Sequence, residues 1–148
     1  MTDFGRLLTA MITPFDEDGD LNYKKARKLA SALIDAGNDG LVIGGTTGEA
    51  PALNNDEKIR LFTEIKEEIG NRGSVVVGTS DNDFLNSREL TKEAEATGAD
   101  GVLLTVPAYN KPPQEGLFQY FRALAESTAL PCLLYNVPSR TALNMTAE

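Results

Sequence analysis

The sequence contains no histidine and no tryptophan, and Cys132 is its single cysteine. Without histidine, the chain cannot assemble a Ser-His-Asp or Cys-His catalytic group, and most kinds of zinc site are excluded as well. One cysteine cannot form an internal disulfide, and Cys132 lies in the apolar run PCLLYNV, where a buried, unreactive thiol is expected. We therefore predict no metal site and expect any catalysis to use other side chains.

Basic residues are also scarce. The 148 residues include 14 lysines and arginines against 22 aspartates and glutamates, a net charge of -8, so a basic patch for nucleic acid or an anionic membrane is not expected. The N-terminal stretch MTDFGRLLTAMITPF has only a short apolar run, which Pro14 ends. It resembles neither a signal peptide nor a membrane span. These features predict a cytoplasmic protein with no nucleic-acid or membrane partner.

Hydrophobic residues make up 41% of the chain, and five short runs of them predict strands. The runs are dense in Val, Ile and Leu rather than alternating, which is typical of parallel strands buried on both faces. They span residues 7–13, 40–45, 74–80, 101–106 and 131–137. Helical spacing of apolar residues occupies the intervals between them, at residues 23–37, 55–70, 87–98 and 114–128.

This alternation predicts one α/β domain over residues 1–148 with a parallel sheet of about five strands and four helices. Two architectures for such a sheet remain possible. A doubly wound sheet can be complete with five strands, whereas a (β/α)8 barrel needs eight strands and about 250 residues. Length favours the doubly wound sheet. The similarity between DAGNDGLVIGG and EATGADGVLLTV instead suggests one unit repeated around a ring.

The most distinctive short stretch is GGTTGEAP, residues 44–51, between a predicted strand and a predicted helix. It lacks the lysine of a phosphate-binding P-loop and the G-x-G-x-x-G spacing of a dinucleotide site. Glycines nevertheless let backbone N–H groups converge on an anion, and the hydroxyls of Thr46 and Thr47 can orient a carboxylate or pass a proton. A plain turn with the threonines capping neighbouring groups is the alternative.

Three further polar residues lie near the ends of the last two predicted strands, with Tyr109 expected to end the fourth strand and Tyr135 the fifth. Tyr109 and Tyr135 are expected at the carboxyl edge of the sheet, where α/β proteins bind ligands, and Arg140 lies just beyond. With the threonine pair they could form a proton relay and a carboxylate clamp. Each taken alone has a simpler interpretation, since tyrosines often pack at strand ends and an arginine can form a surface ion pair.

Three segments together resemble the dihydrodipicolinate synthase family of pyruvate-dependent class I aldolases, a superfamily that includes N-acetylneuraminate lyase. They are GGTTGEAPALNNDEK, LLTVPAYNKPPQEGLFQYF and PCLLYNVPSRT. The resemblance implies a partial (β/α)8 TIM barrel. It also implies a lyase that condenses pyruvate with aspartate semialdehyde in lysine biosynthesis, without a cofactor.

The same resemblance assigns roles to five residues. Thr46, Tyr109 and Tyr135 match the family's proton-relay triad, and the Thr46-Thr47 pair matches its pyruvate-carboxylate site. Arg140 matches the arginine that receives the semialdehyde's carboxylate. The tyrosine that matches Tyr109 reaches into a neighbouring subunit's site, so the resemblance also implies a homo-oligomer.

One departure from the family concerns the lysine that forms a Schiff base with pyruvate. The family carries it on the sixth strand, about one βα period of ~30 residues beyond Tyr135. The seven lysines of this chain are predicted on helices or on the loop after Tyr109, with Lys111 nearest the site edge. We therefore expect the chain alone to be inactive. The alternatives are a non-catalytic, oligomeric partial barrel that binds a small oxoacid, or another aldolase of the superfamily.

Overall fold

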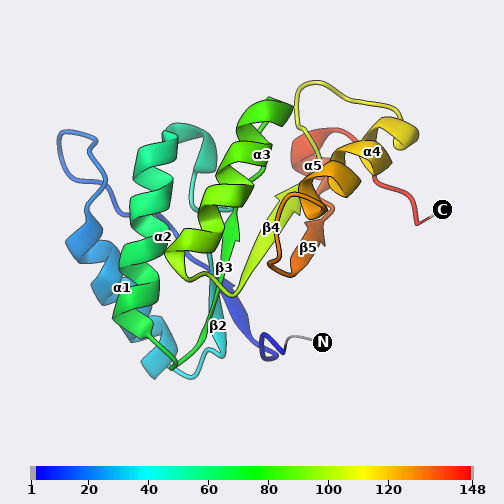
Figure 1. Cartoon of the computed structure of the whole chain (residues 1–148). Helices are drawn as coiled ribbons and strands as arrows, with labels where there is room; N and C mark the ends of the chain where they lie inside the picture. The colour runs from blue at the N-terminus through cyan, green and yellow to red at the C-terminus, as the bar shows by residue number, and fades with distance from the viewer. Residues whose placement is uncertain (1–2, 148) are drawn as a thin grey trace.

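The computed structural model describes residues 3–147 and contains every predicted strand and helix, in the predicted order (Figure 1). Each observed strand lies within its predicted run. The strands are β1 (Leu8–Ala10), β2 (Gly40–Ile43), β3 (Ser74–Gly78), β4 (Gly101–Thr105) and β5 (Cys132–Tyr135). The long helices are α1 (Tyr23–Asp35), α2 (Asn55–Ile69), α3 (Phe84–Glu93) and α4 (Gln114–Ala125). The prediction of one α/β architecture with a parallel sheet is confirmed.

The four long helices end one to five residues earlier than predicted, and two helix starts differ from the prediction. Helix α3 begins at Phe84 because the Asp83 carboxylate accepts hydrogen bonds from the backbone N–H groups of Leu85 and Asn86, at 2.8 and 3.4 Å. A short helix, α5 (Pro138–Thr141), was not predicted and begins with Pro138, a residue whose fixed φ suits a first helical position. Two short 3-10 helices, η1 (Ala50–Ala52) and η2 (Ala94–Thr97), complete the elements of the described chain.

The order of strands in space decides between the two architectures. The strands pair in parallel in the order β1-β2-β3-β4-β5, so each lies beside its neighbour in sequence. A doubly wound sheet would reverse its order near the middle, so that alternative is wrong. The long helices lie together on one side of the sheet (Figure 1), as in a part of a (β/α)8 barrel.

Burial varies across the sheet. Strand β3 is almost entirely buried and β2 and β4 largely so, whereas β1 and β5 are half-buried or exposed. The core lies between the sheet and the helices and includes Phe62, Ile65 and Leu90, all fully buried. Because β1 and β5 are the edge strands, they carry the unpaired backbone groups of this sheet.

Two aspartates explain the Asp-Gly repeat that the sequence shows. Asp39 precedes β2, and its carboxylate accepts hydrogen bonds from the backbone N–H groups of Arg6 and Leu7, at 2.7 and 2.9 Å. These bonds lower the pKa of Asp39. Asp100 precedes β4 and accepts from the N–H of Val75 at 2.8 Å. Each carboxylate thus binds the start of the preceding strand, which aligns the amino-terminal ends of neighbouring strands.

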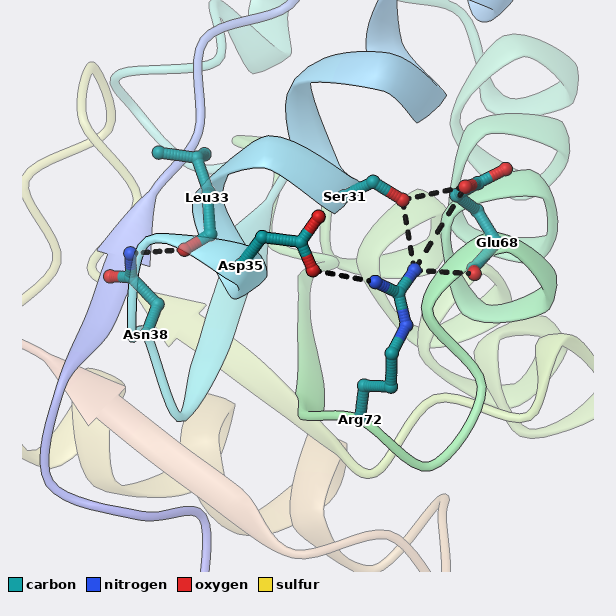
Figure 2. A network of polar contacts seen from close by, with 6 residues as sticks. All are labelled: Ser31, Leu33, Asp35, Asn38, Glu68 and Arg72. Atoms are coloured by element: carbon teal, nitrogen blue, oxygen red, sulfur yellow. Dashed lines mark hydrogen bonds and ion pairs between the residues drawn. The ribbon is translucent and has the colours of Figure 1, made fainter.

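A cluster of polar contacts joins α1 to α2 at this same amino-terminal end (Figure 2). The guanidinium of Arg72 donates to the Asp35 carboxylate at 3.0 Å and to the Ser31 hydroxyl at 2.8 Å. Ser31 in turn donates to the Glu68 carboxylate at 2.6 Å. This cluster of Ser31, Asp35, Glu68 and Arg72 therefore links the C-terminal ends of α1 and α2.

Candidate active site

A cavity of about 290 Å³ lies at the carboxyl edge of the sheet. It is bordered by the segments that follow β2, β3, β4 and β5, together with one side chain from α2. Its lining residues are Gly44, Gly45, Thr46, Ala50, Pro51, Lys58, Gly78, Ser80, Asp81, Asn82, Leu103, Thr105, Val106, Pro107, Ala108, Val137, Arg140 and Thr141. This is the edge at which α/β proteins bind ligands, as the sequence predicted.

Backbone hydrogen bonds hold the GGTTGE loop in a compact turn. The carbonyl of Gly45 accepts from the N–H groups of Gly48 and Ala50, at 3.1 and 3.3 Å. The buried hydroxyl of Thr13, beyond β1, donates to the carbonyl of Gly48 at 2.6 Å. The segment that follows β1 therefore holds the loop in place.

The two threonines of this loop differ in position. Thr46 is half-buried and lines the cavity, and its hydroxyl has no hydrogen-bond partner within residues 3–147. Thr47 is exposed and is not among the residues that line the cavity. Of the predicted pair, Thr46 is thus the one positioned to donate to a ligand in this structure.

The loops after β3 and β4 are tied to each other. The backbone N–H of Thr105 donates to the Ser80 hydroxyl at 2.6 Å, and the N–H of Ala108 donates to the Asn82 side-chain oxygen at 2.9 Å. The side-chain amide of Asn110 donates to the backbone carbonyl of Asn82 at 2.7 Å. This wall of the cavity is consequently held by polar contacts between neighbouring loops.

The tyrosines do not meet Thr46. Tyr135 is the last residue of β5 and is half-buried, but it does not line the cavity. The expectation that Tyr109 ends β4 is wrong, because β4 stops at Thr105 and Tyr109 lies in the following turn with 86% of its surface exposed. Within residues 3–147, no hydrogen bond joins the three hydroxyls, so the proton relay stays a prediction.

Arg140 reaches the cavity from α5, the helix that the sequence did not predict. The residue is exposed, and within the described part of the chain its guanidinium forms no ion pair. It is therefore available to a carboxylate, and with Thr46 it is the part of the predicted site that the structure brings together.

Lys58 is the site residue that the sequence interpretation missed. Its side chain belongs to α2 and lines the cavity, although only 3% of the residue is exposed. The expectation that Lys111 is the lysine nearest the site is wrong, since Lys111 does not line the cavity. The sequence pattern could have identified Lys58, because its spacing places it on the apolar face of α2 with Leu61, Phe62 and Ile65.

The Asp81 carboxylate is the one negatively charged group among the residues lining the cavity. It accepts from the N–H of Asp83 at 3.1 Å and from the side-chain amide of Asn86 at 2.9 Å. Asn55 at the start of α2 donates to Asn86 at 2.6 Å, which connects α2 to this loop. Burial lowers the pKa of Lys58, and the Asp81 charge acts in the opposite direction.

The described residues show little sign of a metal site, a reactive thiol or a membrane-spanning helix. Residues 3–147 hold no group of three or more His, Cys, Asp or Glu side chains arranged for a metal ion. Cys132 is half-buried rather than buried, and burial raises the pKa of its thiol, which disfavours the reactive thiolate. No helix in this range has the length and apolar character needed to cross a bilayer.

Comparisons with known proteins show which family the chain belongs to. Residues 3–148 match the sequence model of the family described as "Dihydrodipicolinate synthetase family". A 4-hydroxy-tetrahydrodipicolinate synthase from Desulforamulus reducens is 55% identical over 143 residues, which are 97% of this chain and 48% of that protein. The chain thus spans about half the length of this curated relative.

Solved structures give the same result. A dihydrodipicolinate synthase from Bacillus anthracis has a TM-score of 0.95 and 46% identity, covering 99% of this chain and 50% of that one. A chloride-inhibited dihydrodipicolinate synthase from Acinetobacter baumannii, complexed with pyruvate, has a TM-score of 0.94 and 40% identity over 97% of this chain and 50% of that one. From its sequence match and its partial TIM-barrel fold, the chain belongs to the dihydrodipicolinate synthetase family.

Proposed function

We propose that this chain provides the oxoacid-binding loops of a synthase that condenses pyruvate with aspartate semialdehyde in the cytoplasm. By itself, the chain binds a small oxoacid such as pyruvate but does not turn it over. In the proposed site Thr46 and Thr47 orient the pyruvate carboxylate, and Arg140 receives the carboxylate of the aldehyde. When pyruvate is the only ligand, Arg140 donates to the pyruvate carboxylate as well. Tyr109, Tyr135 and Thr46 relay protons once a Schiff base is present.

The observation that carries this proposal is that Thr46 and Arg140, 94 positions apart in the sequence, line one cavity at the carboxyl edge. A threonine hydroxyl and a guanidinium, neither bonded to another group of the described chain, are suitable donors for a carboxylate. The pyruvate complex of the Acinetobacter baumannii relative supports pyruvate as the oxoacid.

Catalysis needs an additional group. A Schiff base turns pyruvate into a carbon nucleophile because a protonated imine accepts the electrons of the breaking C–H bond. No lysine of this chain lies on one of the strands of the described structure. A non-catalytic oxoacid-binding protein is the second candidate function, and this same observation favours it.

We predict that replacing Arg140 with alanine weakens pyruvate binding about tenfold. A charge-assisted hydrogen bond contributes about 1.5 kcal/mol or more, and an exposed guanidinium lies at the low end of that range. Thr46→Val should weaken binding by a smaller factor, since it removes one neutral donor. Isothermal titration calorimetry with pyruvate measures both effects.

Arg6→Ala is the matched control, because Arg6 is an exposed arginine at the amino edge of the sheet. Its affinity for pyruvate should equal that of the unaltered chain. If Arg6→Ala and Arg140→Ala lost equal affinity for pyruvate, the effect would come from net charge in general, which would contradict the proposed site.

We also propose that the chain associates with copies of itself. Strand β5 is an edge strand, and its Leu134 is 51% exposed beside Phe118 of α4, which is 58% exposed. Both side chains line a second cavity of about 560 Å³. At roughly 25 cal/mol per Å² of apolar area, covering such a surface contributes several kcal/mol, so association is favourable.

Introducing a charge on this edge should reduce association. We expect Leu134→Lys to shift the chain toward monomer in sedimentation equilibrium at micromolar concentration, since a lysine on an edge strand opposes pairing. Leu85→Lys is the control, because Leu85 is 61% exposed on α3. A purely monomeric unaltered chain would refute the proposal.

A further inference from the structure

The ammonium of Lys58 lies in an unusual environment. Only 3% of the residue is exposed, and no hydrogen bond or ion pair to the side chain occurs within residues 3–147. Every fully buried side-chain nitrogen and oxygen in that range has a hydrogen-bond partner. The Lys58 nitrogen therefore retains contact with open space, and the space that Lys58 lines is the cavity.

The structure holds this lysine firmly in place. Asn54 and Glu57 form a capping box at the start of α2, with hydrogen bonds of 2.9 Å in each direction. Lys58 follows directly on the first turn, and the fully buried Leu61 and Phe62 on the same face anchor the helix to the core. The side chain is thus directed toward the cavity by a rigid element rather than by a loop.

Burying an ammonium without an acceptor is unfavourable, which is why buried lysines are rare unless they are paired. Burial accordingly lowers the pKa of Lys58. The Asp81 carboxylate lines the same cavity but already accepts two N–H groups and forms no ion pair with Lys58 in the described chain. The missing partner of Lys58 is consistent with an anionic ligand.

A second cation borders the same space. Arg140 comes from α5, after β5, whereas Lys58 comes from α2, after β2, so the two approach the cavity from different parts of the sheet. Neither has an acceptor among residues 3–147. Two separate cationic donors in one small cavity suit a ligand with a carboxylate at each end.

We propose that Lys58 is a second carboxylate anchor, and that the cavity therefore prefers small dicarboxylates to monocarboxylates of the same length. This deepens the proposed function, because it rests on Arg140 binding the other carboxylate. Lys58 is a binding residue in this proposal and not the amine of a Schiff base.

The test compares matched acids by isothermal titration calorimetry: malonate with propionate, succinate with butyrate, and glutarate with valerate. We expect the dicarboxylate of at least one pair to bind about tenfold more tightly to the unaltered chain, from one added charge-assisted hydrogen bond. In Lys58→Met this advantage should disappear, because the second carboxylate loses its anchor. Lys111→Met, which alters an exposed lysine outside the cavity, should keep the advantage.

Folding of the variants is checked by thermal unfolding. Lys58→Met should raise the melting temperature without ligand, because it removes a buried, unpaired charge and keeps the apolar stem. A lowered melting temperature would show that Lys58 has a structural role and would overturn the proposal.

The remaining outcomes separate the two proposals. Pyruvate binding with no dicarboxylate advantage overturns the role of Lys58 and leaves the proposed function intact. An advantage that persists in Lys58→Met likewise overturns it. Dicarboxylate binding without pyruvate binding overturns the proposed function and supports Lys58, and an absence of all binding overturns both.

Discussion

Gly78→Ala is expected to lower the free energy of unfolding by about 3 kcal/mol. Gly78 ends β3 opposite Gly44, and a β-carbon on it would lie 2.2 Å from the Gly44 carbonyl oxygen and 2.8 Å from its carbonyl carbon. Both are backbone atoms, so β2 and β3 would have to separate. Since domains are typically stable by only about 5–15 kcal/mol, the loss is large.

Gly44 cannot yield to this added carbon. Its φ is +64°, and its own position is limited by Phe62, whose ring lies 2.9 Å from where a Gly44 β-carbon would be. Because both glycines line the cavity, Gly78→Ala should also weaken pyruvate binding. Urea denaturation measures the loss of stability.

Gly45→Ala is the matched control in the same cavity. A β-carbon there would meet Val42 and Leu103 at 3.5 and 3.8 Å, which are ordinary contacts. We expect its free energy of unfolding to stay within about 0.5 kcal/mol of the unaltered chain. A Gly78→Ala protein as stable as Gly45→Ala would show that the two strands are not packed as described.

Incubation with pyruvate and borohydride is expected to yield no stable adduct, and assays with aspartate semialdehyde should detect no condensation. An imine needs a neutral amine beside the ketone carbon. Lys58 is the one lysine that lines the cavity, and as a carboxylate anchor it must remain charged. Intact-mass spectrometry measures the adduct.

The full-length Desulforamulus reducens synthase, treated in parallel, is the positive control for trapping. Lys58→Met tests the alternative directly. If the chain formed a stoichiometric adduct that this variant lacked, Lys58 would be a nucleophile, and both the expected inactivity and the anchoring role would be wrong.

Local pattern was enough to predict the elements of this fold. The runs dense in β-branched residues became β1 to β5, and the helical periods became α1 to α4. In a parallel sheet, residues that follow a strand lie at the carboxyl edge. Because Thr46 and Arg140 each follow a predicted strand, their positions at that edge were predictable. The segment before β4 ends at Gly98, which lies in the left-handed region at φ +76°.

The sequence by itself therefore determined the fold class, the order of the elements and the edge at which the cavity lies. Only the tertiary structure decided how the strands are ordered in space, that Tyr109 lies exposed while Thr46 lines the cavity, and that Lys58 reaches that cavity. The physical reason is the sequence distance over which each feature is set. The periods of two and 3.6 residues that define strands and helices are local, whereas access to the cavity depends on distances between loops that follow different strands. A polar residue on the apolar face of a helix can be identified as a ligand contact only when the elements facing it are known.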